Sequence, residues 1–150
     1  MVEINGLAHV VLTVSKWEQC SQFYDKILSF FGMNKVFHGE EFIYFVGGRT
    51  AIGISRCKKG RDNELFNQDS IGLHHLCFRA KSREDVDKTY NYLKKLNSNI
   101  VHNPENGSWA PGYYSLLFED PIGTRLEINY VPGTGLLKEG VIFDPTDGYK

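Results

Sequence analysis

A short pattern, Gly-Leu-x-His, occurs twice in the chain, at residues 6–9 and 72–75, so His9 and His75 stand at matching places 66 residues apart. Each copy begins a run of β-favouring residues, and a run with helical spacing follows it. Similarity at a fixed offset is typical of two copies of one supersecondary unit. We therefore expect the two histidines at equivalent positions of an internal repeat.

The first copy predicts the element order βαβββ. Residues 7–14 read as a strand, and Ser15 with Glu18 three residues later has the spacing of a capping box at the start of a helix. Apolar residues then recur at helical spacing until Gly32, which is placed to end the helix. Three shorter runs separated by glycines read as strands, at residues 35–38, 42–46 and 50–57.

The second copy repeats this order after a polar connection over residues 58–70, which reads as a linker. A helix capped by Ser82 follows the first strand of this copy. Its strands are expected at residues 74–80, 100–102, 113–119 and 125–131. We therefore predict a single α+β domain, 1–150, with internal modules 5–57 and 71–131 and a C-terminal tail, 132–150, that packs over the site or onto a partner.

Charge and cysteine content exclude several classes of function. The 17 basic and 18 acidic residues give a net charge of −1 without a basic run, so nucleic acid is not an expected partner. The three cysteines, the absence of a signal-peptide-like start and the lack of an apolar run of about 18 residues argue against disulfides and membrane insertion. We expect a reduced, cytoplasmic protein.

Strand parity places His9, His75 and Glu127 on the polar faces of their strands. One such histidine alone is more often an ordinary hydrogen-bonded residue than a ligand, but matched positions in a repeat favour the ligand interpretation. Two imidazoles and one carboxylate suit a catalytic divalent metal with open coordination positions. His74 has the opposite parity, so we expect it to face away from His75 as a hydrogen-bonded residue of the core or behind the ligands.

The chain resembles the vicinal oxygen chelate superfamily, which includes glyoxalase I, extradiol dioxygenases, fosfomycin-resistance thiol transferases, methylmalonyl-CoA epimerase and bleomycin-resistance proteins. The resemblance extends to about Pro132 and rests on residues 9–14, 23–32, 72–78 and 118–127. It implies two βαβββ modules that form a curved mixed sheet around a metal-containing cleft. It also implies that His9, His75 and Glu127 bind a divalent ion, which could be Fe, Mn, Zn or Ni.

The residues leave the subclass open. Glyoxalase I has a further glutamate on its fourth strand, where this chain has Gly53, so its proton shuttle would need Ser55 or a water instead. Extradiol enzymes usually carry a tyrosine where this chain has Leu117, although Tyr113 shares its strand parity. Fosfomycin enzymes need a basic cluster and a cation-binding loop, and no segment here clearly matches that loop.

We expect a divalent-metal-dependent enzyme that chelates vicinal oxygens of a small-molecule substrate. Dioxygenase-type chemistry is favoured, because three ligands leave room for both substrate and dioxygen. The alternatives are a glyoxalase-like lyase, a fosfomycin-type thiol transferase and a metal-free, ligand-sequestering protein. Tyr113 and Arg125 are expected as catalytic residues, and Ser55, Arg79 and Asn129 as substrate-binding residues. The modules pair either within one chain or across a homodimer, Cys77 is expected to be an ordinary thiol, and His38 and His102 are expected outside the site.

Overall fold

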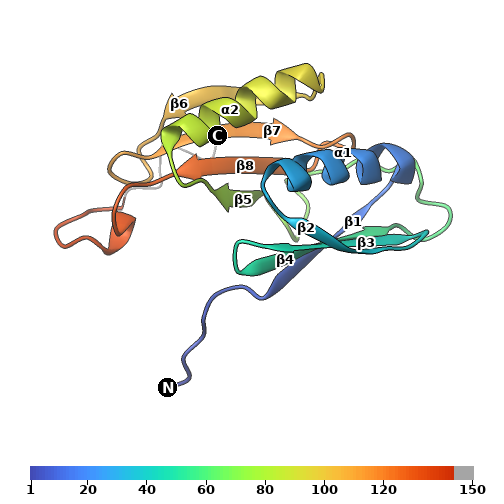
Figure 1. Ribbon diagram of the computed structural model, residues 1–150, viewed down its shortest axis with the longest axis horizontal. Helices are drawn as coiled ribbons and strands as arrows, with labels where there is room; N and C mark the ends of the chain where they lie inside the picture. Colours follow the sequence, from blue (N-terminus) through green and yellow to red (C-terminus); the bar gives the residue numbers. More distant parts are fainter. Residues whose placement is uncertain (144–150) are drawn as a thin grey trace. The chain divides into compact units, whose positions relative to one another are not determined.

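The computed structural model describes residues 1–143, and the chain divides into two compact units, Met1–Phe66 (unit 1) and Asn67–Lys150 (unit 2). Each unit contains one α-helix and one four-stranded mixed sheet in the order βαβββ. Figure 1 shows that each helix runs along one face of the sheet of its own unit. The predicted α+β fold of two βαβββ modules is thereby confirmed.

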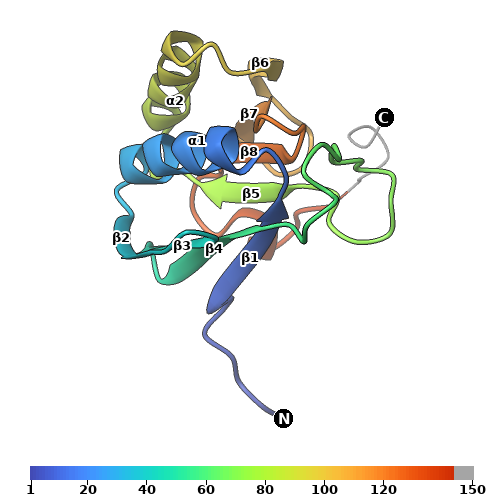
Figure 2. The ribbon, with the colours of Figure 1, turned by 90° about the vertical axis from the view of Figure 1, so that its right-hand side faces the viewer.

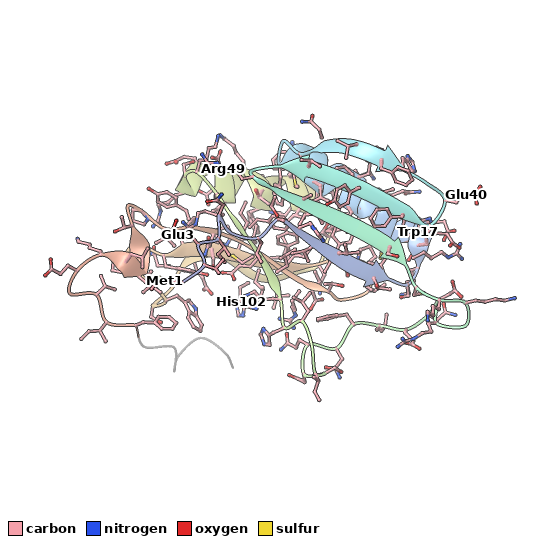
Figure 3. All side chains as sticks on the ribbon, turned by 90° about the horizontal axis from the view of Figure 1, so that it is seen from below. Met1, Glu3, Trp17, Glu40, Arg49 and His102 are labelled. Atoms are coloured by element: carbon pink, nitrogen blue, oxygen red, sulfur yellow. The ribbon has the colours of Figure 1, made fainter. Side chains whose placement is uncertain are left out.

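Unit 1 is built from β1 (His9–Val14), α1 (Trp17–Phe30), β2 (Asn34–His38), β3 (Phe42–Gly47) and β4 (Thr50–Arg56). The sheet order is β1-β4-β3-β2, with β1 parallel to β4 and the remaining pairs antiparallel. Glu40 and Arg49 mark the turns at the two ends of β3 (Figure 3). The core lies between α1 and the sheet, where fully buried side chains include Tyr24, Ile27, Leu28, Phe45 and Ile54.

Unit 2 is built from β5 (Leu76–Arg79), α2 (Arg83–Lys95), β6 (Ile100–Asn106), β7 (Tyr114–Glu119), β8 (Arg125–Tyr130) and the 3-10 helix η1 (Gly135–Leu137). Its sheet has the same connectivity as that of unit 1, with the order β5-β8-β7-β6 and β5 parallel to β8. The side chains that fill its core against α2 include Val86, Leu93, Leu116, Phe118 and Leu126. The opposite face of this sheet is therefore left for polar side chains.

The two helices begin differently. Ser82 caps α2 as predicted, because its Oγ accepts a hydrogen bond from the backbone N–H of Asp85 at 3.2 Å. The capping box predicted for α1 is wrong: the N-cap is Lys16, in a left-handed conformation and without a side-chain cap. Ser15 is buried and donates its hydroxyl to the backbone carbonyl of Glu64, so a contact distant in sequence replaces the local one. Gly32, at φ +76°, follows the end of α1 as predicted.

The other boundaries agree within a few residues, with two differences that bear on the site. β5 begins at Leu76 rather than at residue 74, and β6 continues to Asn106 through register shifts. The connection over residues 58–70 contains turns but neither helix nor strand, as Figure 2 shows. None of the helices within residues 1–143 is long and apolar enough to cross a membrane.

Candidate metal and substrate site

The polar face of the unit 2 sheet forms the floor of a cavity. Backbone pairing places Glu127 of β8 between Cys77 of β5 and Leu117 of β7, and it places Asn129 between Arg79 and Ser115. Side chains of neighbouring strands at paired positions project to the same side of a sheet. These two rows therefore bring acidic, amide, hydroxyl and basic groups together over a short stretch of sheet.

The cavity has a volume of about 850 Å³, and every residue that lines it belongs to unit 2. This volume lies within the roughly 300–1,000 Å³ that small-molecule sites commonly enclose. Six of the eight predicted site residues line it, namely His75, Arg79, Tyr113, Arg125, Glu127 and Asn129. The other two, His9 and Ser55, belong to unit 1. Most of the predicted residues thus gather in a single unit.

Glu127 is the best-connected carboxylate of the cavity. Its Oε1 accepts a hydrogen bond from the Tyr113 hydroxyl at 2.5 Å, and its Oε2 lies 3.4 Å from His75 Nε2. Burial by itself would raise the pKa of Glu127, but hydrogen bonds with His75, Tyr113 and Ser115 outweigh it, so the pKa is lowered. Glu127 is therefore an ionised carboxylate near neutral pH, and its orientation is set by its neighbours.

The His75 and Glu127 pair fits two ligands of one divalent ion. Donors that each lie about 2.1 Å from an ion, at a right angle, are about 3.0 Å apart. The observed separation of 3.4 Å between Nε2 and Oε2 is close to that value. Within residues 67–143, potential metal ligands come together as a pair and not as a group of three. His9, the third predicted ligand, lies on β1 of unit 1 with its side chain exposed.

His74 does not face away from His75, so this prediction is wrong. The Nδ1 atoms of the two rings are 2.8 Å apart, and both residues line the cavity. Strand parity fails here because β5 begins only at Leu76, which leaves both histidines outside the regular alternation. The contact uses Nδ1 of His75, and its Nε2 is directed to Glu127. His74 is hydrogen-bonded next to a predicted ligand, as expected, but on the cavity side.

Arg125 and Arg79 line the cavity in different electrostatic settings. Arg125 Nε forms a salt bridge of 2.7 Å with Glu119 Oε1, so its charge is already balanced on the neighbouring strand. Arg79 is exposed and takes part in none of the salt bridges found among residues 1–143. Of these two predicted residues, Arg79 is therefore the better suited to bind an anionic group.

Cys77 is a thiol rather than a thiolate. Desolvation raises its pKa, and the negative charge of neighbouring Glu127 raises it further. The same causes act on Tyr113, whose pKa is raised by burial and by its hydrogen bond to Glu127. Neither group ionises readily near neutral pH. The expectation that Cys77 is not a nucleophile agrees with this environment.

Sequence reasoning missed two parts of the cavity wall, His102 and the loop before β7. His102 of β6 lines the cavity, although its place near a strand end suggested an ordinary surface histidine. The loop before β7 contributes Trp109. The tail contributes η1 and Phe143, which agrees with the expectation that it packs over the site. The matched position of His38 in the first copy was a signal for His102. Residues 144–150 of the predicted tail lie outside the described part of the chain.

In unit 1, the position that corresponds to the extra glutamate of glyoxalase I is closed by packing. A Cβ atom built on Gly53 would lie 2.9 Å from Phe42 Cζ and 3.1 Å from Val11 Cγ2. The Phe42 ring, which stacks on Tyr44 with centroids 5.8 Å apart, therefore occupies the space beside this glycine. Ser55 lies two residues further along β4, and its hydroxyl donates to the Arg56 carbonyl at 3.4 Å.

The sequence is similar to a known protein family and to a characterised dioxygenase. The family model of the Glyoxalase/Bleomycin resistance protein/Dioxygenase superfamily matches residues 6–128. A 2,2',3-trihydroxybiphenyl dioxygenase from Sphingomonas paucimobilis is 25% identical over 132 residues, which cover 85% of this chain. The chain spans only 42% of the length of that relative.

Solved structures share the fold. A proposed glyoxalase from Bacillus halodurans aligns with a TM-score of 0.74 and 26% identity, over 85% of this chain and 96% of that one. A glyoxylase/bleomycin resistance protein/dioxygenase domain from Frankia sp. EAN1pec aligns with a TM-score of 0.70 and 22% identity, over 85% and 98% of the two chains. The second likeness shows the fold alone.

Proposed function

The chain belongs to the Glyoxalase/Bleomycin resistance protein/Dioxygenase superfamily, and from this premise we propose that it is a divalent-metal-dependent enzyme acting on a small molecule with neighbouring oxygen atoms. The observation that carries the proposal is the pair of His75 Nε2 and Glu127 Oε2, 3.4 Å apart in a cavity of about 850 Å³. His9 is proposed as the third ligand, by its place in the repeat and by the family resemblance. Within the superfamily, dioxygenase-type chemistry is preferred.

Two observations support this preference. The curated relative is a dioxygenase, although the chain spans less than half of its length. Gly53 lacks a carboxylate, and Phe42 and Val11 crowd the space where one would begin. A glyoxalase-like proton transfer would need a base at this place. A lyase is therefore the less favoured alternative, and a fosfomycin-type thiol transferase is also kept as an alternative.

The side chains of the cavity have distinct proposed tasks. Glu127 provides an ionised carboxylate, and the Tyr113 hydroxyl holds that carboxylate in one orientation by donating to Oε1. His75 turns its Nε2 to the same carboxylate while its Nδ1 contacts His74. A divalent ion held by these residues would supply a positive charge that polarises the oxygens of a bound substrate.

The remaining predicted residues are suited to binding and orienting the substrate. Arg79 presents a guanidinium at one end of the polar row, next to Asn129 and Ser115. An anionic substituent can accept hydrogen bonds from a guanidinium in a bidentate arrangement. Arg125 is proposed to act indirectly, because its guanidinium is paired with Glu119. The Asn129 amide can both donate to and accept from substrate oxygens.

Metal binding tests the proposal. The protein is purified without chelators or a histidine tag, its metal content is determined by elemental analysis, and the affinity is measured by isothermal titration. We expect about one ion for each site, loss of binding in His75→Ala and Glu127→Gln, and binding that is weakened but not lost in His74→Ala, because His74 contacts the ring of His75. His38→Ala serves as a matched control, because His38 is an exposed histidine on β2 of unit 1.

The identity of the metal separates the alternatives. Iron supports the dioxygenase, whereas nickel, zinc or manganese supports a lyase or a transferase. A protein that binds no divalent metal, or that binds it equally well after Glu127→Gln, contradicts the proposed function. In that case the cavity would belong to a ligand-sequestering protein without a metal.

A further inference from the structure

We propose that Trp109 and the tail segment 132–143 form a separate apolar subsite, which accepts a planar aromatic group of the substrate and determines which substrates are bound. The inference deepens the proposed function, because the subsite opens into the cavity that contains His75 and Glu127. It assigns a role to a part of the chain that showed no pattern in the sequence.

The wall of the subsite is apolar and aromatic. The Trp109 and Phe143 rings lie with their centroids 5.9 Å apart at an interplanar angle of 41°. Leu136 and Leu137 of η1 complete the wall next to Val131, which follows β8. No acidic or basic side chain lies among these five. Ser108 and Thr134 also line the cavity next to these residues, so the wall is mainly apolar, whereas the floor is polar.

The apolar side chains of the tail are exposed to solvent although they line a cavity. Leu137 is 90% exposed, Phe143 48% and Leu136 43%. Apolar surface in contact with water is unfavourable by about 25 cal/mol for each Å² that could be buried. A planar ring placed between Trp109 and η1 would remove part of this surface from water. Aromatic side chains also prefer offset or edge contacts with another ring at such spacings.

The tail is held against the Trp109 loop by close packing of the Pro132 ring on the backbone of Gly112. A Cβ atom on Gly112, which has φ +73°, would lie 2.7 Å from Pro132 Cγ. Only a glycine allows the loop and the beginning of the tail to approach this closely. Within the tail, the N–H groups of Leu137 and Lys138 donate to the carbonyls of Thr134 and Gly135, at 3.1 and 3.2 Å. Packing and backbone hydrogen bonds therefore both fix the position of this wall.

The occupant is a group of the substrate, because the subsite is continuous with the polar site. The cavity of about 850 Å³ is much larger than a two-oxygen chelating fragment requires. A molecule that directs its oxygens to His75 and Glu127 can therefore carry a second planar group. The charged side chains Arg79 and Arg125 of the same cavity belong to the floor strands β5 and β8, whereas the five wall residues are apolar. An aromatic ring matches the chemistry of this wall best.

The test compares probes that differ by one ring and lack vicinal oxygens. Dissociation constants of phenol and 4-phenylphenol are measured by isothermal titration calorimetry with the full chain. The wild-type protein is expected to bind 4-phenylphenol at least about tenfold more tightly than phenol, since burial of one further ring removes considerable apolar surface from water. Phe143→Ala and Trp109→Ala are each expected to reduce this ratio by about fivefold or more.

Ile142→Ala is the matched control. Ile142 is 90% exposed in the same segment and does not line the cavity, so its removal should leave the ratio unchanged. Far-ultraviolet circular dichroism confirms that each variant is folded, and Leu136→Ala offers a second aliphatic test of the wall. A ratio near one in the wild type, or equal ratios in the wild type, Phe143→Ala and Leu136→Ala, would overturn the subsite.

Failure of the subsite can be told apart from failure of the proposed function. His75→Ala should lose metal binding and retain the ratio of the two probes, because the probes do not chelate. If the ratio of the two dissociation constants depends on Phe143 while the protein binds no metal, the result supports the subsite and contradicts the metal-dependent function. If metal binds through His75 and Glu127 while replacement of Phe143 or Leu136 leaves the ratio unchanged, the result contradicts the subsite alone.

Discussion

Glu127 receives hydrogen bonds from His75, Tyr113 and Ser115, and this environment decides both its charge and its orientation. A carboxylate that is already ionised and oriented needs little rearrangement to become a ligand. Residues that hold a ligand in this way commonly change metal affinity by about 10–100-fold when they are replaced. The short contact from the Tyr113 hydroxyl makes it the first of these residues to test.

Tyr113→Phe is therefore expected to weaken metal binding by about tenfold while leaving the fold intact. The variant removes one hydroxyl and keeps the ring, so the lost interaction is the hydrogen bond to Glu127 Oε1. Isothermal titration with the metal found in the purified protein gives the affinity. Tyr114→Phe is the control, because the Tyr114 hydroxyl donates to Asp87 instead. Equal affinities in Tyr113→Phe and the wild type would refute this positioning role.

Gly53 shows how one missing side chain constrains both packing and chemistry. Gly53→Ala should lower the free energy of unfolding by about 1–3 kcal/mol, because the added methyl group would press on the Phe42 ring and on Val11. Urea denaturation followed by circular dichroism measures the loss. In a Phe42→Ala background the same change should cost much less, since the ring that it meets is gone. An undiminished cost in that background would point to another cause.

At the scale of elements, the two helices use different devices at their N-termini. The N-terminus of α2 is capped by a residue next to it in sequence: the Ser82 hydroxyl oxygen accepts a hydrogen bond from the backbone N–H of Asp85. Before α1, the buried Ser15 donates its hydroxyl to the carbonyl of Glu64, near the C-terminal end of unit 1. The same residue type therefore stabilises a helix end in one module and secures the connection after β4 in the other.

Ser82→Ala should lower the free energy of unfolding by about 1 kcal/mol, the usual cost of losing an N-cap side chain. Ser21→Ala on α1 is a suitable comparison, because it replaces an interior serine by a better helix former and should be neutral or slightly stabilising. Both are measured by urea denaturation. If Ser82→Ala were as stable as the wild type, the observed cap would contribute nothing to stability.

At the scale of the whole molecule, the proposed ligands are divided between the two units. His9 belongs to unit 1, and both His75 and Glu127 belong to unit 2. Modules of this kind pair within one chain or across a homodimer, and the two arrangements differ in which chain supplies His9. Mixing two variants that each lack one proposed ligand distinguishes them through metal binding, without knowledge of the substrate.

His9→Ala and His75→Ala are each expected to lose most metal binding. If the ligands come from two chains, mixing and exchanging equal amounts of the variants should restore about a quarter of the wild-type sites, since half of the dimers are mixed and each has one intact site. If they come from one chain, the mixture should bind no more than its components. Equilibrium dialysis with the identified metal gives the number of sites. Wild-type affinity in His9→Ala would exclude His9 as a ligand.

Sequence periodicity was a good guide wherever a side chain's direction follows from regular backbone. Leu12 and Val14 alternate toward the helix in β1, and Glu127 and Asn129 alternate into the cavity in β8. The same reasoning failed for His74, which lies just before β5, where the chain is not yet regular. The capping-box spacing failed for Ser15 for a different reason, because its hydrogen-bond partner is 49 residues away.

The βαβββ order of elements, the matched histidines and the carboxylate near the end of the second module are readable from the amino-acid order, because alternation and repetition are local properties of a chain. The amino-acid order does not reveal three other features: the hydrogen bonds to Glu127, the Phe42 ring beside Gly53, and the apolar wall that Trp109 and Phe143 form. Each of these depends on segments that meet only after folding. Packing and not periodicity determines such contacts, so no pattern along the chain could reveal them.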